Sequence, residues 1–128
     1  MNPKGVIVRS SSHSVKETID RLVLFLEQHG VTIYARINQQ AESEKAGITI
    51  RPLEFILFGN PKIGGPVMQQ NPVAALDLPL KIIAWEDKEH KVWYAFNDVL
   101  FLQERYGLPQ SLAATLDLQA VTTKALGS

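Results

Sequence analysis

The stretch "FGNPKIGGPVMQQNPVAALDLPLK", residues 58–81, decides how this chain folds, because it joins two apolar runs without being able to form a strand itself. It holds four of the chain's seven prolines and three of its eight glycines. Proline cannot donate to a β-ladder and glycine weakens a strand interior, so a central strand is excluded here. We refer to residues 58–81 as the crossing, and expect one strand to end at Phe58 and another to begin at Leu80.

Upstream of the crossing, the sequence predicts a strand, a helix and a second strand. Residues 6–8 are β-branched and short, which is typical of a strand. Ser14 stands three residues before Glu17, the spacing of a helix-capping pair, and an apolar stripe follows at Val15, Ile19, Leu22 and Leu26. From Val31 the apolar period changes to two, as in a half-buried strand. Residues 38–46 are polar and helix-favouring, and we expect a short exposed helix there.

The segments around and after the crossing predict three more strands and two helical segments. Residues 53–58 are apolar on both faces, as in a strand covered on both sides. Residues 80–85 and 92–96 form two strands joined by the charged turn "EDKEHK". Asp98 begins a helix that Gly107 ends, and Pro109 precedes a further helix in the tail.

These elements together indicate an α+β fold. We expect a mostly antiparallel sheet of about five strands, in strand-helix-four strands-helix order, with the helices packed on one face. Residues 1–108 would form a single domain, and residues 109–128 a helical tail packed on it or at a dimer interface.

Composition excludes several classes of function. The chain of 128 residues carries 13 basic and 13 acidic side chains, whereas nucleic-acid-binding proteins usually carry a basic excess, so no nucleic-acid partner is expected. It has no cysteine, which excludes disulfides, thiolate nucleophiles and zinc-thiolate sites. The histidines, His13, His29 and His90, do not show metal-ligand spacing, so we expect neither a metal nor a cofactor. The first apolar run is too short for a signal peptide or a membrane span, and a cytoplasmic location without membrane contact follows as an expectation.

The crossing is the predicted functional segment. Gly64 and Gly65 precede Pro66, a good first residue for a helix, whose free N–H groups with Lys62 beside them could hold an anion. The alternative is that the glycines only let a loop turn and Lys62 is solvated. Asp77 stands alone among apolar residues, either as a ligand contact or as a carboxylate that binds the local backbone.

Three functions from different classes remain open. The favoured one is a non-catalytic module that binds a small molecule or an anion, with Asn60, Lys62 and Asp77 as polar anchors and Met68 and Trp85 as an apolar wall. The others are an enzyme that uses Asp77 or Glu86 as an acid or base, and a structural homodimer. Catalysis is the less favoured reading. Tyr34, Arg36 and Arg51 could complete a site on the free face of the sheet.

One motif series carries a family resemblance. Phe58-Gly59-Asn60-Pro61, Met68, Pro72 and Ala75-Leu76-Asp77-Leu78-Pro79, followed by "VWYAFNDVLFLQERYGL", resemble domain-of-unknown-function family 302 over residues 5–108. The resemblance implies a fold similar to that of the TATA-binding protein, with one strand, one helix, four strands and one helix. It implies no activity.

Overall fold

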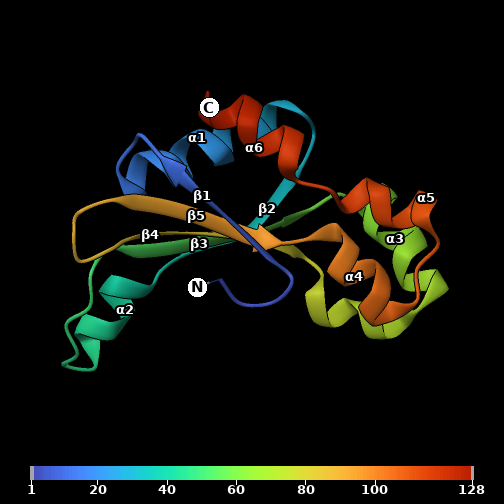
Figure 1. Ribbon diagram of the computed structural model, residues 1–128, viewed down its shortest axis with the longest axis horizontal. Coiled ribbons are helices and arrows are strands. Elements are labelled where there is room, and N and C mark those ends of the chain that lie inside the picture. Colours follow the sequence, from blue (N-terminus) through green and yellow to red (C-terminus); the bar gives the residue numbers. More distant parts are fainter. Residues whose placement is uncertain (1, 128) are drawn as a thin grey trace.

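The computed structural model describes residues 2–127 and shows one five-stranded sheet with helices on one face and at one end (Figure 1). The strands are β1 (Val6–Ser11), β2 (Thr32–Asn38), β3 (Leu53–Gly59), β4 (Leu80–Glu86) and β5 (Val92–Asn97). The α-helices are α1 (Val15–Gln28), α2 (Gln39–Lys45), α3 (Pro61–Gln70), α4 (Val99–Tyr106), α5 (Gln110–Ala113) and α6 (Gln119–Leu126). Two 3₁₀ helices, η1 (Pro72–Asp77) and η2 (Ala114–Leu116), complete the chain.

The strand order is β1-β5-β4-β3-β2, and every neighbouring pair is antiparallel. The predicted α+β class and the order of strands and helices are therefore confirmed. In Figure 1, α1 and α6 lie side by side over one face of the sheet, while α3, α4 and α5 gather at the sheet's end. The crossing is thus the segment that leaves the sheet and builds this helical end.

The face of the sheet under α1 holds the larger core. Ser14 Oγ accepts a hydrogen bond from the Glu17 N–H at 3.1 Å, as the spacing predicts, and the apolar stripe of α1 is fully buried. Its partners include Ile56, Phe58 and Ile82 from the central strands and Leu118 and Leu126 from the tail. We call this cluster the sheet core.

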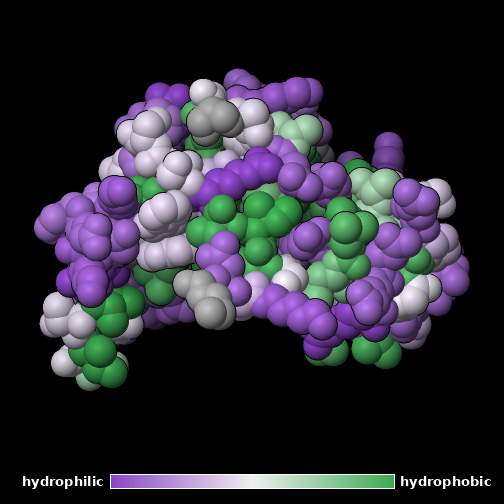
Figure 2. Space-filling view, viewed as in Figure 1, coloured by the Kyte–Doolittle hydropathy of each residue, from purple (hydrophilic) through white to green (hydrophobic). Residues whose placement is uncertain are grey.

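The opposite face of β3 differs from the expectation of a strand covered on both sides. Leu53, Phe55 and Leu57 are only half-buried, whereas Glu54, Ile56 and Phe58 on the face toward α1 are buried. The apolar residues of β3 therefore lie on two different faces of the sheet, one that packs in the core under α1 and one that stays partly exposed. Figure 2 shows apolar side chains gathered over the middle of the sheet and over the helices at its end.

The helix in the crossing begins at Pro61 and not at Pro66, so that expectation was wrong. Asn60 Oδ1 accepts a hydrogen bond from the Lys62 N–H at 3.0 Å, and Pro61, whose φ suits a helix, takes the first helical position. Pro66 then lies inside α3, where it lacks the N–H that would bond to the Lys62 carbonyl. Asn71 caps η1 in the same way ahead of Pro72, with Oδ1 3.1 Å from the Val73 nitrogen.

The tail is not one helix but three short pieces, and it joins two cores. Ala113 and Leu116 pack with Val67, Ala74, Leu102, Tyr106 and Leu108 in a second cluster, which we call the helical core. Leu118, only two residues later, packs in the sheet core. The backbone of Asp117 is extended between them, so the break in the helix lets neighbouring leucines point into different clusters.

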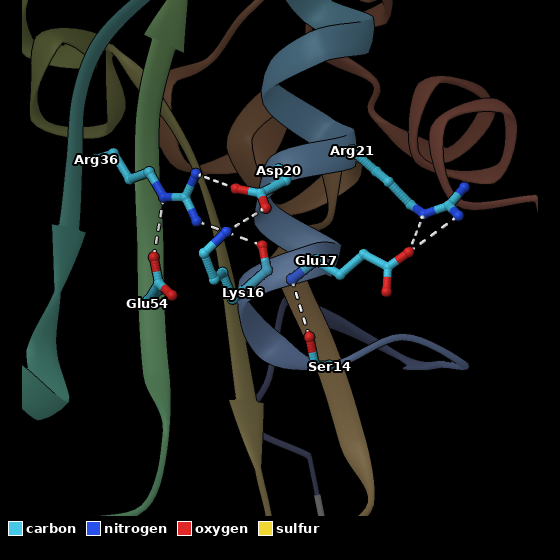
Figure 3. Close-up of polar contacts among 7 residues, drawn as sticks. All are labelled: Ser14, Lys16, Glu17, Asp20, Arg21, Arg36 and Glu54. Carbon is cyan, nitrogen blue, oxygen red and sulfur yellow. Dashed lines mark hydrogen bonds and ion pairs between the residues drawn. The ribbon is translucent and has the colours of Figure 1, made fainter.

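Arg36 belongs to a polar network on the α1 side of the sheet and not to the free face, which corrects the expectation from sequence. Its guanidinium lies 2.6 Å from Asp20 Oδ1 and 2.9 Å from Glu54 Oε1, and it donates to the Lys16 carbonyl at 3.3 Å (Figure 3). Hydrogen bonds from Lys16 and then Arg36 lower the pKa of Asp20. This network ties α1 to β2 and β3.

Candidate functional site: an apolar cleft beside α3

A partly open cleft of about 380 Å³ lies where the end of the sheet, α3 and the tail meet. Most of its lining is aliphatic or aromatic, and the lining side chains come from segments that are far apart in the sequence. They are Leu26, Val31, Tyr34, Phe58, Pro61, Ile63, Met68, Leu78, Pro79, Leu80, Leu116, Leu118 and Val121. Its volume falls in the range of small-molecule sites, about 300–1,000 Å³.

Large apolar side chains remain exposed on the wall of this cleft. Tyr34 is 53% exposed, and Ile63 and Met68 are each 37% exposed. Contact between apolar surface and water is unfavourable compared with burial of that surface. A ligand with an apolar body would displace the water and make its burial favourable.

Four of the side chains that line the cleft carry polar atoms: Tyr34, Asn60, Thr115 and Asp117. The side-chain oxygen of Asn60 caps α3, and the Thr115 hydroxyl donates to the Leu112 carbonyl at 2.5 Å. Asp117 Oδ1 accepts a hydrogen bond from the Gln119 N–H at 3.1 Å, and both Thr115 and Asp117 are exposed. The polar groups therefore lie at the rim of an apolar hollow.

The structure brings three of the residues predicted for the site together and separates the others. Asn60, Gly64 and Met68 all line the cleft. Gly64 faces it closely enough that a Cβ there would lie 3.8 Å from Met68 Cε and 3.9 Å from Leu78 Cδ1. The crossing thus forms one wall of the cleft.

Lys62, Gly65 and Trp85 do not line the cleft. The Lys62 side chain is exposed, and a Cβ on Gly65 would meet nothing within 4 Å. The Gly64 N–H is bonded to the Asn60 carbonyl at 2.9 Å inside the helix, so the anion site expected at the two glycines does not form. Trp85 lies at the other end of β4, opposite Leu53 and Trp93.

Asp77 lies behind the cleft wall, where it connects three elements. Its Oδ2 accepts hydrogen bonds from the Tyr106 hydroxyl and from Arg105 Nη1, the latter at 3.1 Å, and its Oδ1 lies 3.4 Å from Asn97 Nδ2. Burial and the hydrogen bond to Asp77 raise the pKa of Tyr106. Both carboxylate oxygens are thus occupied by donors from β5 and α4.

The structure also brings together two histidines that the sequence separates by many residues. His13 and His90 line an open, polar hollow of about 600 Å³ with Glu86, Lys91, Trp93 and serines 10–12 and 14. His90 Nδ1 lies 3.2 Å from Glu86 Oε2. No group of acidic side chains and histidines among residues 2–127 is arranged to hold a metal ion.

The site residues that sequence reasoning missed are Thr115, Asp117 and the apolar residues of the tail. Their approach to the crossing depends on the packing of Leu116 and Leu118 into two cores, and no local motif signals such a contact. Tyr34 was expected at a site on the free face of the sheet, but it lines the cleft together with Leu26 and Phe58 of the sheet core.

Known proteins share this fold, an antiparallel sheet with helices on one face and at one end. The chain belongs to the family described as Domain of unknown function DUF302, which it matches over residues 7–125, and the predicted resemblance is confirmed. A crystal structure of an uncharacterized conserved protein of this family from Bacillus stearothermophilus superposes with a TM-score of 0.80. It is 18% identical and covers 98% of each chain, which shows the shared fold.

Relatives in Brucella carry a different description. Proteins named fluoride-specific ion channel FluC 1 in Brucella suis and Brucella abortus are each 36% identical over 119 residues, or 93% of this chain. The matched region is 46% and 43% of those proteins, so the chain spans less than half the length of these curated relatives. Among residues 2–127, no helix has the length and apolar character needed to cross a membrane.

Proposed function

We propose that this chain is a non-catalytic small-molecule-binding or regulatory module whose ligand occupies the cleft beside α3. The observation that carries the proposal is the cleft itself, a hollow of about 380 Å³ with an apolar wall and a polar rim. This combination is what a site needs in order to bury most of a small ligand and to orient it by a few polar contacts.

The arrangement of the carboxylates supports binding over catalysis. Asp77 does not line the cleft, and its oxygens are engaged by Arg105, Tyr106 and Asn97, which suits a structural role. Glu86 lies in the polar hollow beside His90, which is 83% exposed, and not in the cleft. An acid or base works best in a site that excludes water, so neither residue has the surroundings that catalysis would require.

The Brucella relatives favour the regulatory form of the proposal. In those proteins the matched region is joined to a larger remainder, and a cleft that binds a small molecule is what an attached domain could contribute. Fluoride itself is a poor candidate ligand for the cleft, because an apolar lining with a carboxylate at its rim opposes the entry of a hydrated anion.

The test is a ligand screen with a variant that fills the cleft. A panel of small apolar compounds is examined by thermal shift and by chemical-shift changes of the leucine, isoleucine and methionine methyl groups. At least one compound should raise the melting temperature and shift the Met68 and Leu118 signals. Gly64→Leu places a side chain in the cleft and should abolish both effects, whereas Gly65→Leu, on the same helix but outside the cleft, should retain them. A panel in which no compound shifts the cleft methyl signals would remove the basis of the proposal.

A further inference from the structure

Among the described residues that line the cleft, the charged side chain is an aspartate, and this restricts the chemistry of the ligand. We propose that the ligand is an apolar molecule with a hydrogen-bond-donating head that carries no negative charge, either a hydroxyl or an ammonium group, and that this head lies against Asp117. The inference rests on the proposed function, because it assigns the ligand class of the same cleft. It also replaces the sequence-based expectation of an anionic ligand.

Asp117 is the one charged side chain that lines the cleft among residues 2–127. In that described range no lysine, arginine or histidine pairs with it. Lys62, the cation that the sequence places nearest, is exposed on α3 and does not line the cleft. A carboxylate or phosphate in the cleft would therefore lie near the uncompensated negative charge of Asp117, which repels it.

The polar atoms of Asp117, Thr115 and Asn60 fit a donor head, and the Tyr34 hydroxyl, which also lines the cleft, can donate or accept. Asp117 Oδ1 is used by the Gln119 N–H, and the second carboxylate oxygen is an acceptor for a ligand. The Thr115 hydroxyl gives its proton to the Leu112 carbonyl, so toward a ligand it can only accept. Asn60 Oδ1 caps α3, which leaves its Nδ2 group as the donor. A hydroxyl head can donate to Asp117 and accept from Asn60, and an ammonium head can pair with the Asp117 charge.

The apolar wall of the cleft determines how the affinity depends on the length of the ligand's apolar body. Ile63, Met68, Leu78 and Val121 offer aliphatic surface and Tyr34 and Phe58 offer aromatic surface. Each methylene that leaves water for this wall should tighten binding about four-fold, from the usual transfer free energy of a buried methylene.

The experiment compares ligands that differ only in the head. Hexylamine, 1-hexanol and sodium hexanoate are titrated at pH 7 into the full chain, and binding is measured from the methyl chemical shifts of Met68 and Leu118. Hexylamine and hexanol should bind, and hexanoate should bind at least ten-fold more weakly than either. The corresponding butyl compounds should bind more than ten-fold more weakly than their hexyl counterparts.

A pair of matched variants isolates the role of the charge. Asp117 and Asp98 each accept a hydrogen bond from the backbone N–H two residues later, Asp98 as the N-cap of α4 and Asp117 one residue before the N-cap of α6. An asparagine side-chain oxygen can accept the same hydrogen bond at either position, so both aspartate-to-asparagine variants should fold. Asp117→Asn should weaken hexylamine binding, remove the penalty on hexanoate and leave hexanol binding within two-fold. Asp98→Asn, which changes the same net charge outside the cleft, should leave all three affinities unchanged.

The outcomes separate this inference from the proposed function. Hexanoate binding as tightly as hexylamine, or an unchanged order of affinities in Asp117→Asn, would overturn the assignment of the head group while leaving a small-molecule site in the cleft. Failure of all compounds to shift the cleft methyl signals would overturn both the inference and the function on which it rests.

Discussion

Replacing Asp77 by alanine should cost the folded state about 2–3 kcal/mol, because the change leaves a buried hydroxyl without its acceptor. The Tyr106 side chain is almost fully buried, at 7% exposure, and an unsatisfied buried polar group costs about 1–3 kcal/mol. The pair with Arg105, whose side chain is 46% exposed, adds roughly 0.2–1 kcal/mol, as for other solvent-accessible ion pairs. The contact with Asn97 is long, at 3.4 Å, and should contribute little.

Urea unfolding followed by circular dichroism measures this cost, and a double-mutant cycle assigns it. Tyr106→Phe removes the hydroxyl but keeps the ring, so the combined Asp77→Ala and Tyr106→Phe variant should be more stable than the sum of the two single losses implies. A coupling of about 1 kcal/mol or more is expected, because the residues are in direct contact. A loss below about 0.5 kcal/mol for Asp77→Ala, or a coupling near zero, would refute the structural role assigned to this carboxylate.

Three further predictions address the helix, the tail and the response to pH. Gly65→Ala should not give the gain of about 0.5–1 kcal/mol that this change usually brings inside a helix, because a Cβ at residue 65 would crowd the ring of Pro66; differential scanning calorimetry should show an unchanged or lower melting temperature, and a clear rise would contradict it. Deleting residues 109–128 should abolish cooperative unfolding and the near-ultraviolet circular dichroism signal, because it removes Leu116 from the helical core and Leu118 from the sheet core. A truncated chain with native spectra would contradict this prediction. Because the pKa of Tyr106 is raised in the folded state, its contribution to stability is complete below about pH 10 and is lost as the pH rises through the folded value. Stability curves measured between pH 8 and 11.5 should therefore fall less steeply for Tyr106→Phe, and parallel curves would contradict the assignment.

A fifth prediction concerns assembly. The homodimer expected from the sequence remains a prediction, and size-exclusion chromatography with light scattering should give a mass twice the 14.3 kDa of one chain. A mass of one chain at micromolar concentration would contradict it.

The parts of the fold that the sequence predicts are those that local signals determine. The Ser14 cap with its stripe of apolar residues, and the helix from Asp98 to Gly107, depend on contacts within a few residues. Gly107 ends α4 in the left-handed region with φ 62°, which glycine adopts at little cost. Alternation of apolar residues likewise identifies β2, because the strand period of two is a local property.

The start of α3 was misplaced because two local signals compete there. Asn60-Pro61 and Gly65-Pro66 both fit the start of a helix, and the paired glycines before Pro66 favour the second. The structure uses an asparagine-proline pair in both places, at residues 60–61 for α3 and at residues 71–72 for η1. A proline inside a helix loses one backbone hydrogen bond and crowds the carbonyl four residues earlier, at a cost of about 3 kcal/mol, yet α3 runs on through Pro66.

The site was only partly predictable because its members come from distant segments. Trp85 was assigned to the wall of the crossing, yet it follows Leu80 by five residues along an extended strand, which is about 17 Å at the usual rise. That separation could have been inferred from the sequence. The position of Asp117 at the cleft could not be inferred from the sequence, because it depends on how the tail packs against two cores.

The contrasting packing of Leu116 and Leu118 has a consequence for the motions of the molecule. Both leucines touch the cleft, while one is anchored in the helical core and the other in the sheet core. A compound bound between them would make local opening of the helical core and of the sheet core less frequent. As the compound is added, hydrogen-deuterium exchange of the amides in α4 and in α6 should therefore slow in parallel.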